Sequence, residues 1–121
     1  MLETINLTPI NTFEEIECYK MVYRHPKDPN KCISYVQGYE YTIGEENEPV
    51  DIKTDGKSYT DVDRSIFLVV REGYHSYASK DIQCCQDTCI ARCIIPAGSR
   101  YFKDVYGKQY VSSNIIIKEL L

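Results

Sequence analysis

The chain has 121 residues, of which 43% are hydrophobic, so it is long and apolar enough to form one folded domain. Acidic residues outnumber basic ones by 18 to 14, which gives a formal net charge of −4. This balance argues against a disordered chain and against a general nucleic-acid-binding protein, which would need a broad basic face. We expect a single domain over residues 1–121, in which any grip on a phosphate group is made by a few arginines.

The first residues lack the basic and apolar regions of a secretion signal, and no apolar run approaches the roughly 18–20 residues of a membrane span. Six cysteines without such a signal are typical of free thiols in a reducing compartment. The sequence therefore predicts a cytoplasmic protein with no membrane contact and no structural disulfides.

The first part of the chain predicts strands separated by turns. Aromatic and β-branched residues alternate with polar ones from Glu17 to Arg24, which indicates a strand. Two prolines and an Asp/Asn pair within residues 25–30 predict a turn. Further strands are expected over residues 32–37 and 39–43, with a bend at Gly38 between them.

The middle of the chain predicts two more strands and a helix. An edge strand is expected over residues 50–54, followed by a tight Asp-Gly turn. Residues 66–70 are the most apolar run and predict a strand near the middle of a sheet. Residues 78–86 predict a short helix that begins at a serine N-cap.

The last part of the chain predicts a strand and a hairpin. A strand over residues 90–95 is expected to end at the Pro-Ala-Gly turn of residues 96–98. Residues 100–102 and 109–118 would then form the hairpin around a turn at 104–107. Together these elements predict an α+β fold, mainly an antiparallel β-sheet of about six strands with one or two short helices.

Four of the six cysteines crowd into ten residues: Cys84, Cys85, Cys89 and Cys93. Their spacing does not match the paired C-x2-C units of common zinc sites. On a helix, Cys85, Cys89 and Cys93 would line one face, as small apolar residues do against a core. We therefore expect buried structural thiols rather than a metal site or a reactive thiol, and we predict neither a metal nor a cofactor.

Candidate catalytic groups are few. Of the two histidines, His25 precedes a proline in a predicted turn and is expected to be solvated. His75 lies in the compact segment Gly73-Tyr74-His75-Ser76-Tyr77, where it is either a structural histidine or part of a ligand site. The chain has no nucleophile elbow, no H-E-x-x-H motif and no phosphate-binding glycine loop. We expect no catalytic residues and no enzymatic activity.

Three arginines are expected at strand ends, where pockets commonly form: Arg24, Arg71 and Arg100. The planar guanidinium group grips phosphate oxygens at two points. Two tyrosines follow Arg71 closely, and an aromatic face beside a guanidinium group suits a stacked base. We therefore predict a nucleotide-binding pocket made by Arg24, Arg71, Tyr74, His75, Tyr77 and Arg100.

An ordered set of short motifs runs along most of the chain. It begins with Arg24 after a tyrosine-rich strand and continues with the Gly73–Tyr77 segment. Cys93-Ile94-Ile95-Pro96-Ala97-Gly98-Ser99-Arg100-Tyr101 and Tyr110-Val111-Ser112-Ser113-Asn114-Ile115-Ile116-Ile117 follow. Over roughly residues 17–119, this set resembles the first family of Thoeris anti-defence proteins, which phages encode.

This resemblance implies sequestration rather than catalysis. Members of the family bind cyclic ADP-ribose isomers made by bacterial TIR-domain defence enzymes and hold them intact, and some are implicated in binding cyclic oligonucleotides. The resemblance thus implies a homo-oligomer in the host bacterial cytoplasm that binds a cyclic nucleotide-type ligand and no nucleic-acid polymer. Arg24 and Arg100 would hold the diphosphate, while Tyr74 or Tyr77 would stack on the adenine.

Two other classes of protein remain as alternatives. An ADP-ribose-handling enzyme would need Glu40 or a late carboxylate beside His75, and the missing transferase motifs count against it. A protein–protein interaction module, such as an inhibitor of a host enzyme, would show a tyrosine-rich exposed patch. The eleven tyrosines of the chain favour this second alternative over the first.

Overall fold

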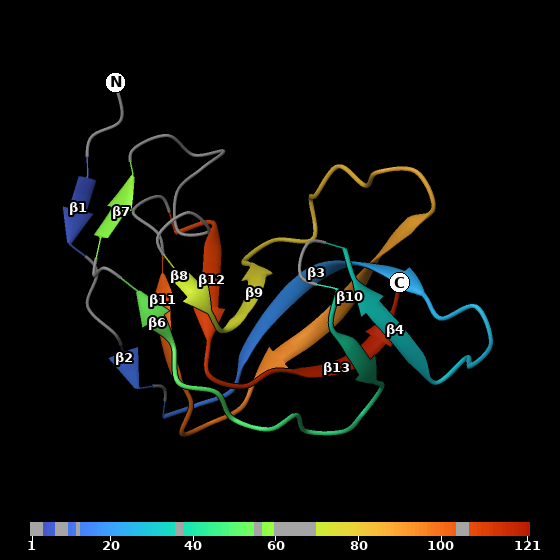
Figure 1. Cartoon of the computed structure of the whole chain (residues 1–121), viewed down its shortest axis with the longest axis horizontal. Helices are drawn as coiled ribbons and strands as arrows, with labels where there is room; N and C mark the ends of the chain where they lie inside the picture. Colours follow the sequence, from blue (N-terminus) through green and yellow to red (C-terminus); the bar gives the residue numbers. More distant parts are fainter. Residues whose placement is uncertain are drawn as a thin grey trace.

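The computed structural model describes residues 4–6, 10–11, 13–35, 38–54, 57–59, 70–103 and 107–121. All regular structure in these ranges is β-strand (Figure 1). The strands are β1 (Thr4–Asn6), β2 (Ile10–Asn11), β3 (Ile16–Arg24), β4 (Lys31–Ser34), β5 (Glu40–Thr42), β6 (Lys53–Thr54), β7 (Lys57–Tyr59), β8 (Val70–Glu72), β9 (Tyr74–Tyr77), β10 (Thr88–Ile95), β11 (Arg100–Lys103), β12 (Gln109–Ser112) and β13 (Ile116–Leu120). The described part is all-β, so the α+β prediction is wrong.

The predicted helix over residues 78–86 is replaced by bends and a turn that connect β9 to β10. The Ser79 hydroxyl does accept a backbone N–H, from Asp81 at 3.1 Å, but it stabilises a bend rather than a helix start. Most side chains of this segment are exposed, and only Ala78 and Ile82 are half-buried. A helix this short is marginal in water unless an apolar face packs against the core, and the segment offers no continuous face.

One large antiparallel sheet organises the molecule around its longest strand, β3. The strand order is β13-β10-β3-β9-β12-β11-β2, and β4 and β5 extend the sheet from β3 on a second branch. One edge of β3 pairs with β10 over eight positions, from Ile16 opposite Ile95 to Tyr23 opposite Thr88. The other edge pairs with β9 at Tyr19 and with β4 from Val22 onward, so the sheet forks there.

The chain that follows β5 returns to the last strand and closes over the interior. The Gly44 N–H donates to the Ile117 carbonyl oxygen at 2.7 Å, and Glu46 forms a bridge with Ile116. The Asn47 side chain donates to the Ile115 carbonyl oxygen, also at 2.7 Å. These contacts hold the end of the β4–β5 branch against β13. β13 pairs with β10, and β10 and β4 pair with opposite edges of β3.

The core lies inside this bend and follows the period-two alternation of strands. Its buried residues come from β3, β4, β5, β9, β10, β13 and the residue before β13: Cys18, Val22, Cys32, Tyr41, Tyr74, Ala91, Cys93, Ile95, Ile115 and Ile117. Lys20 shares the inward phase of Cys18 and Val22 on β3 and is only 4% exposed. A lysine is thus placed among apolar residues and thiols.

Several sequence predictions can be compared with these strands. The strands expected over 17–24 and 90–95 are confirmed as β3 and β10. The turn expected at 25–30 is confirmed as well, and it connects β3 to β4. The expected strand over 109–118 is divided into β12 and β13. The predicted strand over 66–70 lies outside the described residues except for its last residue, which begins β8. The Asp55-Gly56 turn and most of the 104–107 turn also lie outside them.

The helical arrangement of cysteines is wrong because the segment is not a helix. Cys84 and Cys85 are exposed in the loop before β10, whereas Cys89 and Cys93 lie on β10 itself. Cys93 is buried as expected, together with Cys18 and Cys32. In the described ranges, no helix has the length and apolar character needed to cross a membrane.

Candidate functional site

The two arginines predicted to hold one diphosphate lie at opposite ends of β3. Arg24 ends this strand, whereas Arg100 begins β11, five residues after Ile95, which pairs with Ile16 at the start of β3. Eight residues of extended strand separate Ile16 from Arg24, about 26 Å at ~3.3 Å per residue. Figure 1 shows the two regions on opposite sides of the molecule. A single copy of the chain therefore does not bring Arg24 and Arg100 to one ligand.

Two other predicted site residues are part of the interior. The Tyr74 hydroxyl donates to the Glu48 carbonyl oxygen at 2.8 Å, and its ring packs against Tyr39 and Tyr41. His75 points to the opposite face of β9, where its Nε2 lies 2.8 Å from Gln109 Oε1. Both side chains are more than nine-tenths buried. Tyr74 is thus not available to stack on a ligand.

Tyr77 is the predicted aromatic that reaches a cavity. Its ring meets the His75 ring edge-on, with 4.9 Å between centroids, and burial raises the pKa of its hydroxyl. The cavity has a volume of about 370 Å³ and is lined by Tyr77, Ala78, Ser79, Asp81, Ile82, Gly107 and Lys108. Arg71 lies on β8, but its side chain is outside the part that the structure describes.

Arg24 reaches a different cavity, which we call the Arg24 cleft. It has a volume of about 300 Å³ and opens where β3 turns into β4, close to the end of β13. The cleft is lined by Arg24, His25, Pro26, Lys27, Asp28, Pro29, Lys31 and Leu120. Seven of these residues lie within one short stretch of chain, so a single β-hairpin builds most of the cleft.

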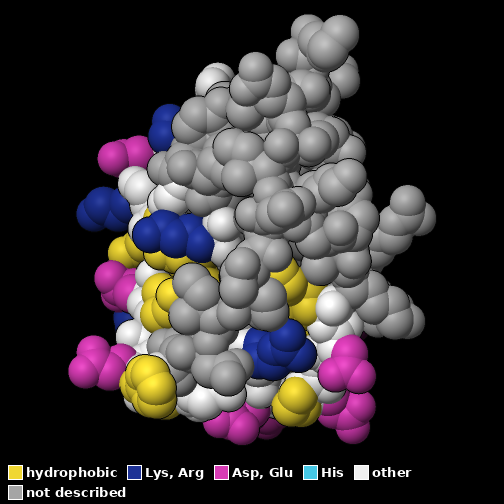
Figure 2. Space-filling model, turned by 90° about the vertical axis from the view of Figure 1, so that its left-hand side faces the viewer, with side chains coloured by type: hydrophobic (Ala, Val, Ile, Leu, Met, Phe, Trp, Pro, Cys, Tyr) yellow, Lys and Arg dark blue, Asp and Glu magenta, His cyan; other side chains and the backbone are white. Residues whose placement is uncertain are grey.

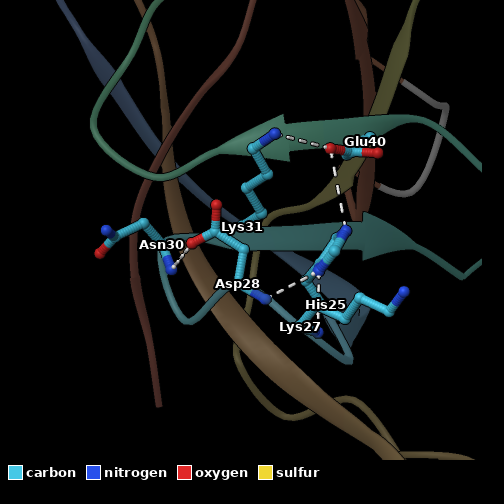
Figure 3. Close-up of polar contacts among 6 residues, drawn as sticks. All are labelled: His25, Lys27, Asp28, Asn30, Lys31 and Glu40. Atoms are coloured by element: carbon cyan, nitrogen blue, oxygen red, sulfur yellow. Dashed lines mark hydrogen bonds and ion pairs between the residues drawn. The ribbon is translucent and has the colours of Figure 1, made fainter.

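His25 organises the loop of this hairpin (Figure 3). Its Nδ1 accepts the backbone N–H groups of Lys27 at 3.1 Å and Asp28 at 2.9 Å. The Asp28 carboxylate then accepts the Asn30 N–H at 2.9 Å, and the Asp28 carbonyl oxygen accepts the Lys31 N–H at 3.2 Å. His25 was expected to be solvated without a role, but it is half-buried and its ring fixes the loop.

Cations dominate the charge around the cleft. Lys31 Nζ lies 3.1 Å from Glu40 Oε1, and hydrogen bonding to Glu40 raises the pKa of Lys31. The same carboxylate oxygen lies 3.9 Å from His25 Nε2, so Glu40 faces His25 rather than His75 (Figure 3). Arg24 and Lys27 form no ion pair with any described residue. The cleft therefore has positive charge that internal ion pairs do not neutralise.

Sequence reasoning identified Arg24 but missed the lysines that accompany it. The available signal was a run of three cations, Arg24, Lys27 and Lys31, spaced around a proline-containing turn. A hairpin necessarily brings the two ends of such a turn together. The contribution of Leu120 could not be seen in the same way, because it depends on the pairing of β13 with β10.

The interior holds a second unpredicted group, centred on Lys20. Its ammonium group donates to the His75 carbonyl oxygen and lies 5.6 Å from the centroid of the Tyr41 ring. Burial lowers the pKa of Lys20 to about 8, while the thiols of Cys93, Cys18 and Cys32 oppose this shift. No carboxylate among the described residues forms an ion pair with it. This group is enclosed, in contrast to the Arg24 cleft.

The chemistry available at the Arg24 cleft is anion binding. A guanidinium fork and two ammonium groups can donate hydrogen bonds to phosphate oxygens, and charge-assisted bonds of this kind are strong. The cations of the cleft lie on one hairpin, which suits a small anion held locally better than a nucleic-acid polymer. On the other side of the molecule, seen in Figure 2, the described basic and acidic side chains are interspersed.

Comparisons of the chain with protein-family models, with curated proteins and with solved structures found no match. The fold and the clefts are therefore interpreted from their own geometry.

Proposed function

We propose that this protein binds a small phosphate-bearing nucleotide at the Arg24 cleft and sequesters it without cleaving it. A ligand of the cyclic ADP-ribose type is the candidate that the sequence resemblance suggests, with sequestration blocking bacterial anti-phage defence. The observation that carries the proposal is the convergence of Arg24, Lys27 and Lys31 on one open cleft of a net-acidic protein. Among the predicted site residues, Arg24 is the one that joins other cations.

The loop geometry supports tight binding. His25 and Asp28 satisfy the backbone groups of the loop, so the cations on it are presented from a fixed frame. A preformed site loses less conformational entropy when a ligand binds. Contacts to charged groups contribute roughly 1.5–3 kcal/mol each. Three contacts at the upper end of this range, with a stacked base that adds roughly 1–3 kcal/mol, come to the roughly 12 kcal/mol that nanomolar binding requires.

We propose that the stacking aromatic is Tyr77, supplied by a second copy of the chain. Tyr77 pairs with Tyr19 on β3, five residues before Arg24, which is about 16 Å along a strand. Arg100 is farther still. A homo-oligomer with its ligand at a subunit boundary would reconcile these separations with the two arginines and one tyrosine that the resemblance assigns to one ligand.

Native mass spectrometry of the protein incubated with cyclic ADP-ribose isomers tests this proposal. The wild-type protein should carry whole-number ligand masses, and the ligand should be recovered unaltered after denaturation. Arg24→Ala should weaken binding at least tenfold, because it removes the fork without disturbing the loop. Arg92→Ala is the matched control, since Arg92 pairs with Glu119 and Glu17 outside the cleft.

The outcomes separate the possible sites. Loss of binding in Arg24→Ala alone places the ligand within one hairpin, whereas a loss in Arg100→Ala and Tyr77→Ala as well places it between copies. Unchanged affinity in Arg24→Ala contradicts the proposed site. Recovery of a cleaved ligand contradicts sequestration and moves the protein to the enzyme class.

A second candidate function, a protein–protein interaction module, is favoured by one observation. Tyr23 and Tyr35 lie side by side on the outer face of β3 and at the end of β4, with ring centroids 5.7 Å apart. Both are more than a third exposed. Tyrosine is enriched in interfaces because its ring is apolar and its hydroxyl is polar. Tyr23→Ser should leave nucleotide binding unchanged and weaken binding to a host enzyme.

A further inference from the structure

Cys18 and Cys93 occupy directly opposite positions in the β3–β10 ladder. Both side chains are fully buried, on the same inward face. Directly opposite residues of an antiparallel pair have Cα atoms about 4.5–5.5 Å apart. This separation lies within the range of about 4.4–6.8 Å that a disulfide spans. Of the six cysteines, these are the two that face each other across a ladder of the described sheet.

The surroundings of the two sulfur atoms differ. Hydrogen bonding from Cys93 lowers the pKa of Cys18, burial opposes this shift, and the nearby Ser76 hydroxyl and Lys20 ammonium group lower the pKa further. The Ser76 hydroxyl is buried and has no hydrogen-bond partner among the described residues. Burial raises the pKa of Cys93, whose thiol lies 3.5 Å from the Ala91 carbonyl oxygen. The pKa values of the two thiols are therefore shifted in opposite directions.

We propose that Cys18 and Cys93 form a redox-active dithiol that peroxide converts to a cross-strand disulfide. This inference concerns the interior and is independent of the proposed ligand site. Lys20, which lacks a carboxylate partner in the described structure, stabilises the anionic sulfur of Cys18.

The step balances as two reactions. The Cys18 thiolate attacks one oxygen of hydrogen peroxide, the O–O bond breaks, and Cys18 sulfenic acid and hydroxide form. The Cys93 sulfur then attacks the Cys18 sulfur, the S–OH bond breaks, and a disulfide and water form. The two cysteines together lose two electrons, and peroxide accepts them.

Peptide mapping of the oxidised full-length chain tests the proposal. The reduced protein is treated with hydrogen peroxide in native buffer and, in parallel, in concentrated urea. The remaining thiols are then blocked under denaturing conditions and the protein is digested with trypsin. Cleavage after lysine and arginine isolates Cys18 in residues 1–20 and Cys93 in residues 93–100. Cys32 falls in residues 32–53, and Cys84, Cys85 and Cys89 fall together in residues 81–92, so a link between Cys18 and Cys93 can be told apart from every other linkage.

We expect the native sample to yield residues 1–20 linked to residues 93–100 as its main disulfide, and the urea sample to lose this preference. The double variant Cys84→Ser/Cys85→Ser is the matched control. It should still form the link between Cys18 and Cys93, because Cys84 and Cys85 are exposed and replacing them leaves the buried pair unchanged. In Cys93→Ala, Cys18 should accumulate as a sulfenic acid that dimedone traps.

Three results would overturn the proposal. The first is a native sample in which Cys84 and Cys85 oxidise while Cys18 and Cys93 stay fully alkylatable. The second is a main linkage from Cys18 to Cys32, which would show that the ladder register does not select the partner. The third is a 1–20/93–100 link that forms equally well in urea. All three use the wild-type chain, so they hold even if Cys93→Ala does not fold.

Discussion

Lys20 and Arg24 lie four residues apart on β3 and share its inward phase, yet their environments differ completely. Lys20 is enclosed by thiols, an aromatic ring and a carbonyl oxygen, whereas Arg24 is exposed at the mouth of a cleft. The difference arises because the middle of β3 lies between β10 and β9 and its inward face packs into the core, whereas Arg24 is the last residue of the strand and adjoins the turn to β4. One strand thus places one cation in the core and offers another to solvent.

The comparison shows that a buried cation does not require a carboxylate. Lys20 is stabilised by a backbone carbonyl, by the face of Tyr41 and by polarisable sulfur, and its lowered pKa reflects the cost of desolvation. Arg24 forms no ion pair with any residue that the structure describes, so its hydrogen-bonding capacity remains for a ligand. Free capacity for binding is therefore expected at the end of β3 and not at its middle.

The largest expected effect concerns the pH dependence of stability at Lys20. In the folded protein its pKa is about 8, against an ordinary value near 10.5, so the folded state binds fewer protons between these pH values. The free energy of unfolding of the wild type should therefore rise relative to that of Lys20→Met as pH increases through this window. The full change should be about 3 kcal/mol. Urea unfolding of both proteins at several pH values measures it.

A difference between the two proteins that does not vary with pH would show that the Lys20 amine is not desolvated. It would also remove the contrast with Arg24. Below about pH 8, Lys20→Met should be more stable than the wild type, because it has no charged group to desolvate. The loss of the hydrogen bond to the His75 carbonyl oxygen, which methionine cannot make, reduces this gain in stability.

An intermediate effect is expected for the hydroxyl of Tyr41, whose ring lies beside the Lys20 ammonium group. Tyr41 is 1% exposed, and its hydroxyl has no hydrogen-bond partner among the described residues. Tyr41→Phe should therefore raise the free energy of unfolding by about 1 kcal/mol, because a buried unsatisfied hydroxyl is removed. Tyr74→Phe is the matched control with the opposite sign, since it loses the bond to the Glu48 carbonyl oxygen. Thermal unfolding compares them, and destabilisation in both would contradict this account.

The smallest effect is expected at the rim of the Arg24 cleft. Glu40→Gln removes the carboxylate that pairs with Lys31, so more positive charge faces the cleft. Affinity for inorganic phosphate or a nucleotide should rise about two- to threefold at low salt. Stability should hardly change, because exposed ion pairs contribute little. Titration calorimetry at two salt concentrations measures the change, and weaker binding in this variant would argue that the ligand is not anionic.

The parts of the fold that were predictable depend on local signals. Alternation identified β3 and β10, and the two prolines near His25 identified the turn that carries the cleft. The sequence could not show that residues 78–86 do not form a helix. These residues are compatible with a helix, and only the fold shows that they have no neighbouring face to cover. The three consecutive isoleucines Ile115, Ile116 and Ile117 are all buried, so the chain is covered on both faces there.

The site was predictable only in part, because strand register is a non-local property. Arg24 ends β3, and Arg100 begins β11 shortly after the end of β10. Because β10 pairs antiparallel with β3, the end of β10 lies beside the start of β3 and far from Arg24. Tyr74 and Tyr77 lie three residues apart on β9, so they face opposite sides of the sheet. The alternation over residues 17–24 sets Lys20 among the polar positions, opposite in phase to Tyr19 and Tyr23, so the sequence did not indicate that Lys20 is enclosed.

The fork at β3 has a consequence for how the chain is made. One edge of β3 can be covered early, because β4 follows it within a few residues. The other edge waits for β10, which pairs along almost its whole length and leaves the ribosome more than sixty residues later. During that interval the nascent chain presents an open strand edge that carries Cys18 and Lys20 near its middle. An unpaired edge invites contact with other chains. The charge of Lys20, which later lies in the core, disfavours such contacts until β10 pairs with this edge.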